Sequence, residues 1–138
     1  MNKWKPDYIT NPLNAEDMAA IKVICKGFKA RRKFGKVGVA HAISNDELSK
    51  AIAKWTDNKI VLNSARIRKL INYIRCTGLV PDLCASKKGY FVAANVVEFN
   101  TYLHESLYPR VMAQLHMIGK LKEHSSFKGL QEFDFKID

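Results

Sequence analysis

The chain has 138 residues, of which 47% are hydrophobic and 26% are charged, and its formal net charge is +10. This is the size and composition of one globular domain with a hydrophobic core, which excludes collagen-like, low-complexity and disulfide-scaffold proteins. Uncharged apolar stretches are shorter than the roughly 18 residues that cross a bilayer, and residues 1–5 lead into a polar segment rather than the apolar core of a signal peptide. We therefore expect a cytoplasmic protein.

The positive charge is concentrated in one internal segment. Residues 22–75 hold fourteen lysines and arginines against three acids, whereas the rest of the chain holds nine bases and ten acids. A positive field confined to one region is typical of a surface that binds a polyanion, because each neutralised phosphate releases condensed counterions. Charge alone leaves two main interpretations open, a face for nucleic acid and a solvated surface that keeps the protein soluble. An acidic membrane surface ranks behind both.

The first part of the chain predicts a helix followed by a short strand. An irregular arm over residues 1–14 ends at Asn14, which caps a helix that begins at Ala15. That helix ends within residues 30–35, where a run of bases complements the carbonyl end of the helix dipole. Alternation of apolar and small residues over 37–43 predicts the strand.

Two well-marked helices follow. Ser44 and the glutamate three residues later form a capping box that starts a helix over about residues 45–55. The next helix, over about residues 64–77, is capped by Asn63 or Ser64, and its apolar residues recur at the spacing of one helix face. The remaining face of this helix is basic, bears amide side chains and is nearly free of acids.

The second half of the chain predicts a β-hairpin and a long helix. Strands over residues 79–85 and 90–94 flank a turn over residues 86–89, which ends in a glycine that supplies backbone freedom. A helix capped by Asn95 comes next. Pro109 either kinks this helix or opens a new one at its first position.

The segment from the second helix to the hairpin resembles a known family. Residues 62–75, with the sequence LNSARIRKLINYIR, are similar to the recognition helix of small winged helix-turn-helix proteins of bacteriophages and mobile elements. Residues 78–81 and 85–93 resemble their wing, in which a Gly-Tyr step opens the returning strand, and residues 42–48 resemble the start of their preceding helix. The resemblance covers about residues 40–105. It implies an α+β winged helix-turn-helix fold, here with an N-terminal basic helix and a C-terminal helical extension.

The element order and the resemblance together imply a function. The basic helix of such a fold enters the major groove of double-stranded DNA, where arginine reads guanine and asparagine reads adenine. Lysines at the hairpin tip reach the flanking backbone. Residues 15–106 then form the winged-helix domain, and residues 107–138 form a helical extension and tail. We expect a non-catalytic, cytoplasmic transcriptional regulator or accessory factor of a bacterial cell or a phage-infected host.

The candidate DNA-binding residues fall into three groups. For each group the alternative is structural: a solvated helix face, ordinary loop lysines, or a helix end whose bases complement the dipole. The DNA interpretation requires the cationic side of residues 63–75 to face outward beside the hairpin. The candidates are Asn63, Ser64, Arg66, Arg68, Lys69, Asn72, Tyr73 and Arg75 on the basic helix, Lys87 and Lys88 at the hairpin tip, and Arg31, Arg32, Lys33 and Lys36 at the end of the first helix.

No catalytic or metal-binding motif accompanies these bases. The four histidines show no HExxH or His-x3-His pairing, and no glycine-rich phosphate loop or GxSxG motif is present. The chain has three cysteines, Cys25, Cys76 and Cys84, and no two of them form a CxxC motif, which fits a reducing compartment. We interpret all three as buried apolar groups. We expect no catalysis, no metal and no cofactor.

Apolar residues around Pro109 bear on the partners of the protein. They recur at helical spacing over residues 107–121, and they either form the seam of a homodimer or pack on their own domain. A dimer suits the pairing of helix-turn-helix proteins on two DNA half-sites. The alternative function is a winged-helix adaptor that binds a protein partner and no DNA.

Overall fold

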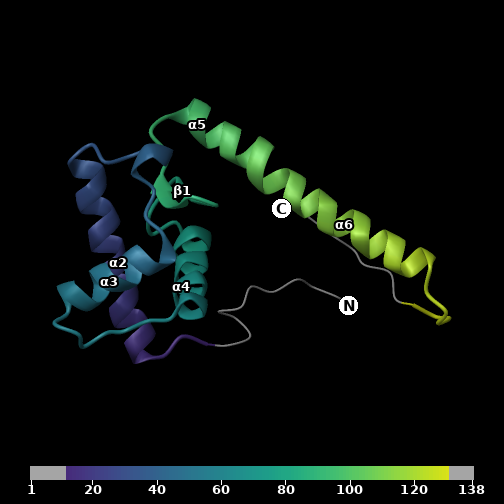
Figure 1. Ribbon diagram of the computed structural model, residues 1–138, viewed down its shortest axis with the longest axis horizontal. Helices are drawn as coiled ribbons and strands as arrows, with labels where there is room; N and C mark the ends of the chain where they lie inside the picture. The colour runs from purple at the N-terminus through teal and green to yellow at the C-terminus, as the bar shows by residue number, and fades with distance from the viewer. Residues whose placement is uncertain (1–11, 131–138) are drawn as a thin grey trace.

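The computed structural model describes residues 12–130 and shows an α+β architecture (Figure 1). It begins with α2 (Ala15–Lys33), α3 (Asn45–Trp55) and α4 (Ser64–Thr77), which pack against one another. Residues 1–11 of the predicted arm and residues 131–138 of the predicted tail lie outside the described range.

A hairpin and a long helical segment follow the three helices. β1 (Leu83–Ser86) and β2 (Gly89–Val92) pair antiparallel. The helical segment is made of α5 (Val96–Thr101), a π-helical stretch η2 (Tyr102–Leu107) and α6 (Tyr108–Glu123). The predicted order of the helices and the hairpin is confirmed.

The first helix begins and ends where its sequence predicts. Asn14 caps α2, and its side chain and that of Asp17 each accept the other's backbone N–H. The helix ends at Lys33, the last of three consecutive bases. One side of α2 is buried, and this side carries Ile24 and Phe28.

The ends of α3 and α4 are also as predicted. Ser44 and Glu47 form the capping box of α3. Asn63, rather than Ser64, caps α4, and its Oδ1 accepts the backbone N–H of the third helical residue at 2.8 Å. Gly78 ends α4 in the left-handed conformation, with a φ of 72°.

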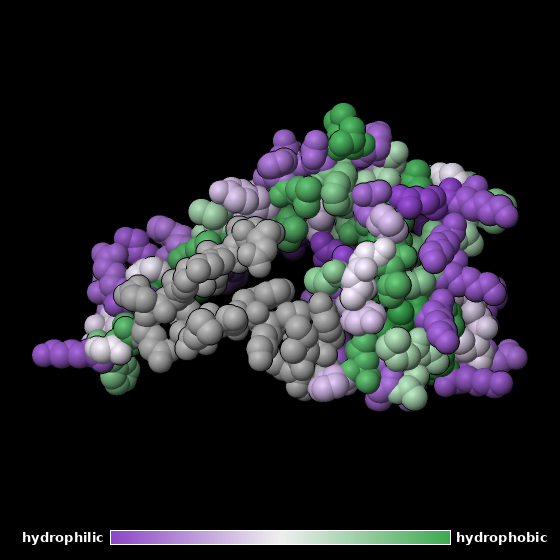
Figure 2. All heavy atoms as spheres, turned by 180° about the vertical axis from the view of Figure 1, so that it is seen from behind, coloured by the Kyte–Doolittle hydropathy of each residue, from purple (hydrophilic) through white to green (hydrophobic). Residues whose placement is uncertain are grey.

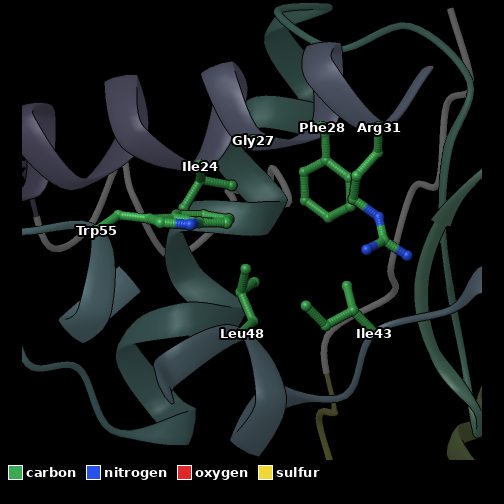
Figure 3. Close-up of a pocket in the computed structure, with 7 residues that line it drawn as sticks. All are labelled: Ile24, Gly27, Phe28, Arg31, Ile43, Leu48 and Trp55. Carbon is green, nitrogen blue, oxygen red and sulfur yellow. The ribbon is translucent and has the colours of Figure 1, made fainter. Parts of the chain in front are cut away.

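A glycine allows α2 and α3 to approach closely. The ring of Trp55, at the end of α3, lies against Gly27 of α2, where a Cβ would be 2.8 Å from its Cη2 atom. Figure 3 shows this ring between the two helices, beside Ile24 and Leu48. Half of the Trp55 surface, 52%, nevertheless faces solvent. A Cβ at Gly27 would displace the Trp55 ring from this position.

The strand predicted over residues 37–43 is wrong. Gly38 turns the chain with a φ of 90°, and residues Val39–His41 form a single 3₁₀ turn, η1. The backbone N–H of Val39 donates to the side chain of Glu98 on α5, and that of Gly38 donates to the Val92 carbonyl of β2. What remains of the strand is one bridge, in which Ile43 and Tyr90 exchange backbone hydrogen bonds of 2.9 and 2.8 Å.

The hairpin is shorter than its sequence predicts. β1 begins at Leu83 instead of residue 79, because Asp82 adopts a left-handed φ of 65° and the backbone N–H of Leu79 returns to α4. The predicted turn over residues 86–89 is confirmed, with Ser86 paired to Gly89.

The two faces of the hairpin contact different layers. Leu83 and Tyr90 belong to the main core, which they share with the three helices. Cys84 and Phe91 point the other way and form a second cluster with Tyr102 of η2. This alternation follows from the two-residue period of a strand. The hairpin therefore lies between the three-helix core and the long helical segment.

The long helical segment continues past the second cluster as an extended rod (Figure 1). Pro109 stands in the first turn of α6, where it has no N–H for the carbonyl four residues earlier. The wider π-helical turn just before it gives room for the proline ring. The helical segment continues through Pro109 without ending. No residue of α6 is buried within the described part of the chain.

Candidate nucleic-acid interface

The solvent side of α4 carries a polar strip. Arg68 and Asn72 are exposed and Lys69 is half-buried, on the side of the helix opposite its four core residues. Exposed Ala65 and Cys76 extend this side toward the two ends of the helix. We call these five residues the α4 strip. It contains two bases, one amide and no acid.

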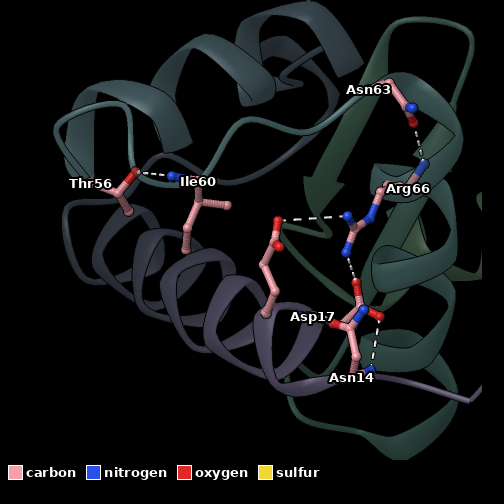
Figure 4. Close-up of polar contacts among 7 residues, drawn as sticks. Asn14, Asp17, Thr56, Ile60, Asn63 and Arg66 are labelled. Carbon is pink, nitrogen blue, oxygen red and sulfur yellow. Dashed lines mark hydrogen bonds and ion pairs between the residues drawn. The ribbon is translucent and has the colours of Figure 1, made fainter.

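Arg66, a predicted DNA contact, binds carboxylates of α2 (Figure 4). Its guanidinium donates to Oδ1 of Asp17 and lies 3.6 Å from Oε1 of Glu16. Burial by itself raises the pKa of the Asp17 carboxyl. Hydrogen bonds from Arg66 and the Asn14 backbone lower this pKa, as do the charges of Arg66 and Lys69, and together they outweigh burial, so the pKa of Asp17 is lowered. The hydrogen bond to Asp17 raises the pKa of Arg66. Arg66 thus joins α4 to the first turn of α2.

Arg75, at the other end of α4, is also engaged within the protein. Its Nε donates to the backbone oxygen of Leu83 at 3.1 Å, and a terminal nitrogen donates to the Tyr102 hydroxyl. The guanidinium carbon lies 5.7 Å from the centre of the Tyr102 ring, a cation–π distance. Arg75 therefore connects α4 to β1 and to η2.

The other candidates on α4 have different surroundings. Asn63 is exposed, but its side-chain oxygen caps the helix. Ser64 is exposed in the first turn. Tyr73 is half-buried and packs against the main core.

The hairpin tip presents Lys87 and Lys88 from a fixed turn. The Ser86 hydroxyl donates to the Gly89 carbonyl at 3.1 Å and accepts the backbone N–H of Lys88 at 3.2 Å. Gly89 has a φ of 121°, and a Cβ there would lie 2.3 Å from the carbonyl oxygen of Ile43. The turn therefore packs directly on the segment that precedes α3, and both lysines are exposed.

Tyr90 connects the hairpin to the start of α3. Its hydroxyl donates to Oδ1 of Asn45, the first residue of α3, at 2.7 Å. Burial raises the pKa of Tyr90, and the positive charges of Arg68 and Arg75 and the hydrogen bond to Asn45 oppose that rise. The hairpin and the start of α3 are therefore neighbours.

The four bases at the end of α2 lie at the opposite end of the hairpin. Arg31 donates to a backbone carbonyl of η1, and Figure 3 shows its side chain beside that of Phe28. Arg32 forms an ion pair of 3.1 Å with Asp82, which precedes β1. Lys33 and Lys36 are exposed. In the view from behind, hydrophilic side chains line the outer edge of the globular part, away from α6 (Figure 2).

The structure brings some predicted residues together and separates others. Arg68, Lys69 and Asn72 share one side of α4, whereas Arg66 and Arg75 bind groups of neighbouring elements. The helical spacing of the sequence does not distinguish the exposed bases from Arg66 and Arg75, because the groups that bind these two arginines come from other parts of the chain. The prediction also missed Arg110, which lines a groove with the tip lysines. No local signal in the sequence connects α6 to the hairpin.

The prediction that all three cysteines are buried is wrong for one of them. Cys25 and Cys84 are buried, and burial raises the pKa of both thiols, that of Cys84 to about 11. Cys76 is exposed at the end of the α4 strip. Its position in the helix, two residues after the buried Ile74, faces it away from the core.

Comparisons with protein-family models, curated proteins and solved structures find no match for this chain. Within residues 12–130, no helix has the length and apolar character to span a membrane. The same residues contain no group of three or more histidine, cysteine, aspartate or glutamate side chains that is placed to hold a metal ion.

Proposed function

We propose that this protein is a winged helix-turn-helix protein that binds double-stranded DNA without catalysing a reaction. The observation that carries the proposal is the α4 strip, which is basic and free of acids and lies on the solvent side of a helix that contacts the hairpin through Arg75. The resemblance of residues 40–105 to small phage and mobile-element proteins supports a role as a transcriptional regulator or accessory factor.

The order of the elements supports the winged-helix part of the proposal. Three packed helices lead to the hairpin, and Ile43 before α3 bridges to Tyr90 in the returning strand. In such a fold α3 and α4 form the helix-turn-helix and the hairpin is the wing. The wing here has four-residue strands, each about 13 Å long.

The side chains suggest how DNA would be contacted. In the proposed complex, Arg68 and Asn72 face base edges in the major groove, and Lys69 and Ser64 contact phosphates. Lys87 and Lys88 contact the flanking backbone. Arg66 and Arg75 have a different role in this proposal, since they fix the orientation of α4 through Asp17 and Tyr102. They do not read the DNA.

We also propose that α6 pairs two copies of the protein. No residue of this helix is buried in the described chain, and Val111, Met112 and Leu121 are 44–66% exposed along it. In proteins most helical stability comes from the packing of an apolar side, which favours an α6 that is covered by a partner. The seam would lie within residues 107–121, and two copies would place two α4 strips on two half-sites.

The exposed apolar residues of α6 also favour the second candidate function. In an adaptor, α6 would bind a different protein, and the bases of α4 would only solubilise the surface. The two functions differ in their salt dependence. DNA binding weakens steeply with salt, whereas apolar docking through α6 does not.

The experiment is a titration of a fluorescein-labelled duplex, followed by anisotropy at several salt concentrations. We expect binding whose log–log salt slope reflects several phosphate contacts, at about −0.9 per contact. Sedimentation of the free protein, in parallel, tests the pairing of α6. Absence of duplex binding at low salt would reject the DNA-binding proposal and leave the adaptor.

A further inference from the structure

A groove runs between the hairpin tip and the start of α6. Its volume is about 450 Å³ and it is open to solvent. Lys87 and Lys88 line it from the tip, and Glu105, Ser106 and Arg110 line it from the helix. These charged groups comprise three bases and one acid, so the groove is positive.

Arg110 is held in place before any ligand arrives. Its Nε donates to the backbone oxygen of Ser106 at 3.1 Å, and a terminal nitrogen donates to the Ser106 hydroxyl at 3.2 Å. A guanidinium has five N–H donors, so most of them remain for an acceptor in the groove. The turn opposite is fixed by Ser86, as described above. Binding an anion here therefore costs little side-chain ordering.

We propose that this groove binds the sugar-phosphate backbone of one DNA strand, with Arg110 as a phosphate contact. The proposal rests on the proposed function and extends the DNA surface from the wing onto the long helix. Through the hydrogen bond between Tyr90 and Asn45, the hairpin that lines the groove also contacts α3 of the proposed helix-turn-helix.

The openness of the groove favours a strand over a small anion. Sites for small ligands enclose most of the ligand surface and present converging polar groups. Here Lys87, Lys88 and Arg110 are all exposed, so a free phosphate would keep most of its water and gain little. A polyanion gains from every neutralised phosphate through counterion release.

The experiment compares Arg110→Ala with Lys120→Ala on the full chain. Lys120 is an exposed base farther along the same helix, paired with Glu123, so each variant removes one positive charge from α6. We expect Arg110→Ala to weaken duplex binding severalfold and to make the salt slope shallower by about 0.9. Lys120→Ala keeps the slope of the unmodified protein.

The possible outcomes separate this inference from the proposed function. If the two variants have equal salt slopes while Arg68→Ala still loses duplex binding, the proposal that the groove binds a DNA strand is rejected. The proposed DNA-binding function then stands. No duplex binding by the unmodified protein would overturn both. A third experiment titrates the unmodified protein with inorganic phosphate and follows the Arg110 Nε–H resonance by NMR. Saturation of that resonance at micromolar phosphate would mark a small-anion site and reject the strand.

Discussion

The guanidinium of Arg66 binds the carboxylate of Asp17, a residue 49 positions earlier in the chain. Arg66 belongs to the helix proposed to meet DNA, yet its charge serves the packing of that helix. Asp17 exposes 4% of its side chain and Arg66 exposes 35%, so the pair lies at the edge of the interface between α2 and α4. The Arg66–Asp17 pair fixes the position of α4, and the remaining bases of this helix are the ones proposed to contact DNA.

Asp17→Asn should destabilise the protein at neutral pH. The substitution removes the charge of a buried, hydrogen-bonded pair, and we expect a loss of about 1–2 kcal/mol in the free energy of unfolding, because the exposure of Arg66 limits the effect. The folded pKa of Asp17 is lowered. Its stabilisation is therefore complete above the unfolded pKa of about 3.9 and is lost as pH falls through the lower folded value.

Urea unfolding at neutral and acidic pH measures this effect. The difference in stability between the unmodified protein and Asp17→Asn should shrink as the pH falls below about 4. Glu16→Gln is the matched control, since the Glu16 carboxylate lies 3.6 Å from Arg66 but is half exposed. A stability difference for Asp17→Asn that stays constant with pH would contradict the role given to the pair.

Asn72→Ala should relax base preference without unfolding the protein. Asn72 is exposed on the α4 strip, so its removal leaves no cavity. If it pairs with an adenine, the preference for a selected duplex over a scrambled one should fall on the order of tenfold. Competition binding with duplexes selected from a random pool measures the ratio. Asn100→Ala, an exposed asparagine on α5, is the control, and an equal loss in both variants would remove Asn72 from the interface.

Cys76 provides a native reporter of the α4 strip. It is exposed, whereas Cys25 and Cys84 are buried with raised pKa values. Brief treatment with iodoacetamide should therefore modify Cys76 alone, since the thiolate is the reactive form. Bound duplex should slow this reaction severalfold, as peptide mass spectrometry would show. An unchanged rate at saturating duplex would place the DNA on another face.

Gly89→Ala should weaken both the fold and the binding of all DNA sequences. The new Cβ would meet the Ile43 carbonyl at 2.3 Å, at a φ that alanine rarely adopts. We expect a loss of about 1–3 kcal/mol in unfolding free energy, and a displaced wing with weaker binding to every duplex. Gly119→Ala on α6 meets no atom within 4 Å and should stabilise the helix slightly. Full stability of Gly89→Ala would contradict the tight turn.

Local signals in the sequence define the helices well. The capping residues Asn14, Ser44 and Asn63 act on amides within three residues, so their effect is readable from neighbouring positions alone. Gly78 ends α4 for the same reason. The segment after Gly35 is different. Its hydrogen bonds go to Glu98 and Val92, and alternation of residue types cannot reveal partners so far along the chain.

The same division applies to the candidate site. The basic face of α4 can be predicted from the sequence, but the helical spacing predicts the same DNA-contacting role for Arg66, Arg68 and Arg75. Tertiary contacts separate them, because Asp17 binds the first and Leu83 and Tyr102 bind the last. Arg110 shows the reverse case. Folding places it across a groove from the hairpin tip, which no pattern in its own helix indicates.

The most direct measurement compares Arg68→Ala with Lys54→Ala in duplex binding over a range of salt. Both residues are exposed bases, but Lys54 lies near the end of α3 that is farther from the hairpin tip. The account predicts that Arg68→Ala binds duplex at least several times more weakly, while Lys54→Ala keeps the affinity and salt slope of the unmodified protein. Equal effects of the two substitutions would show that the α4 strip is not the surface that meets DNA.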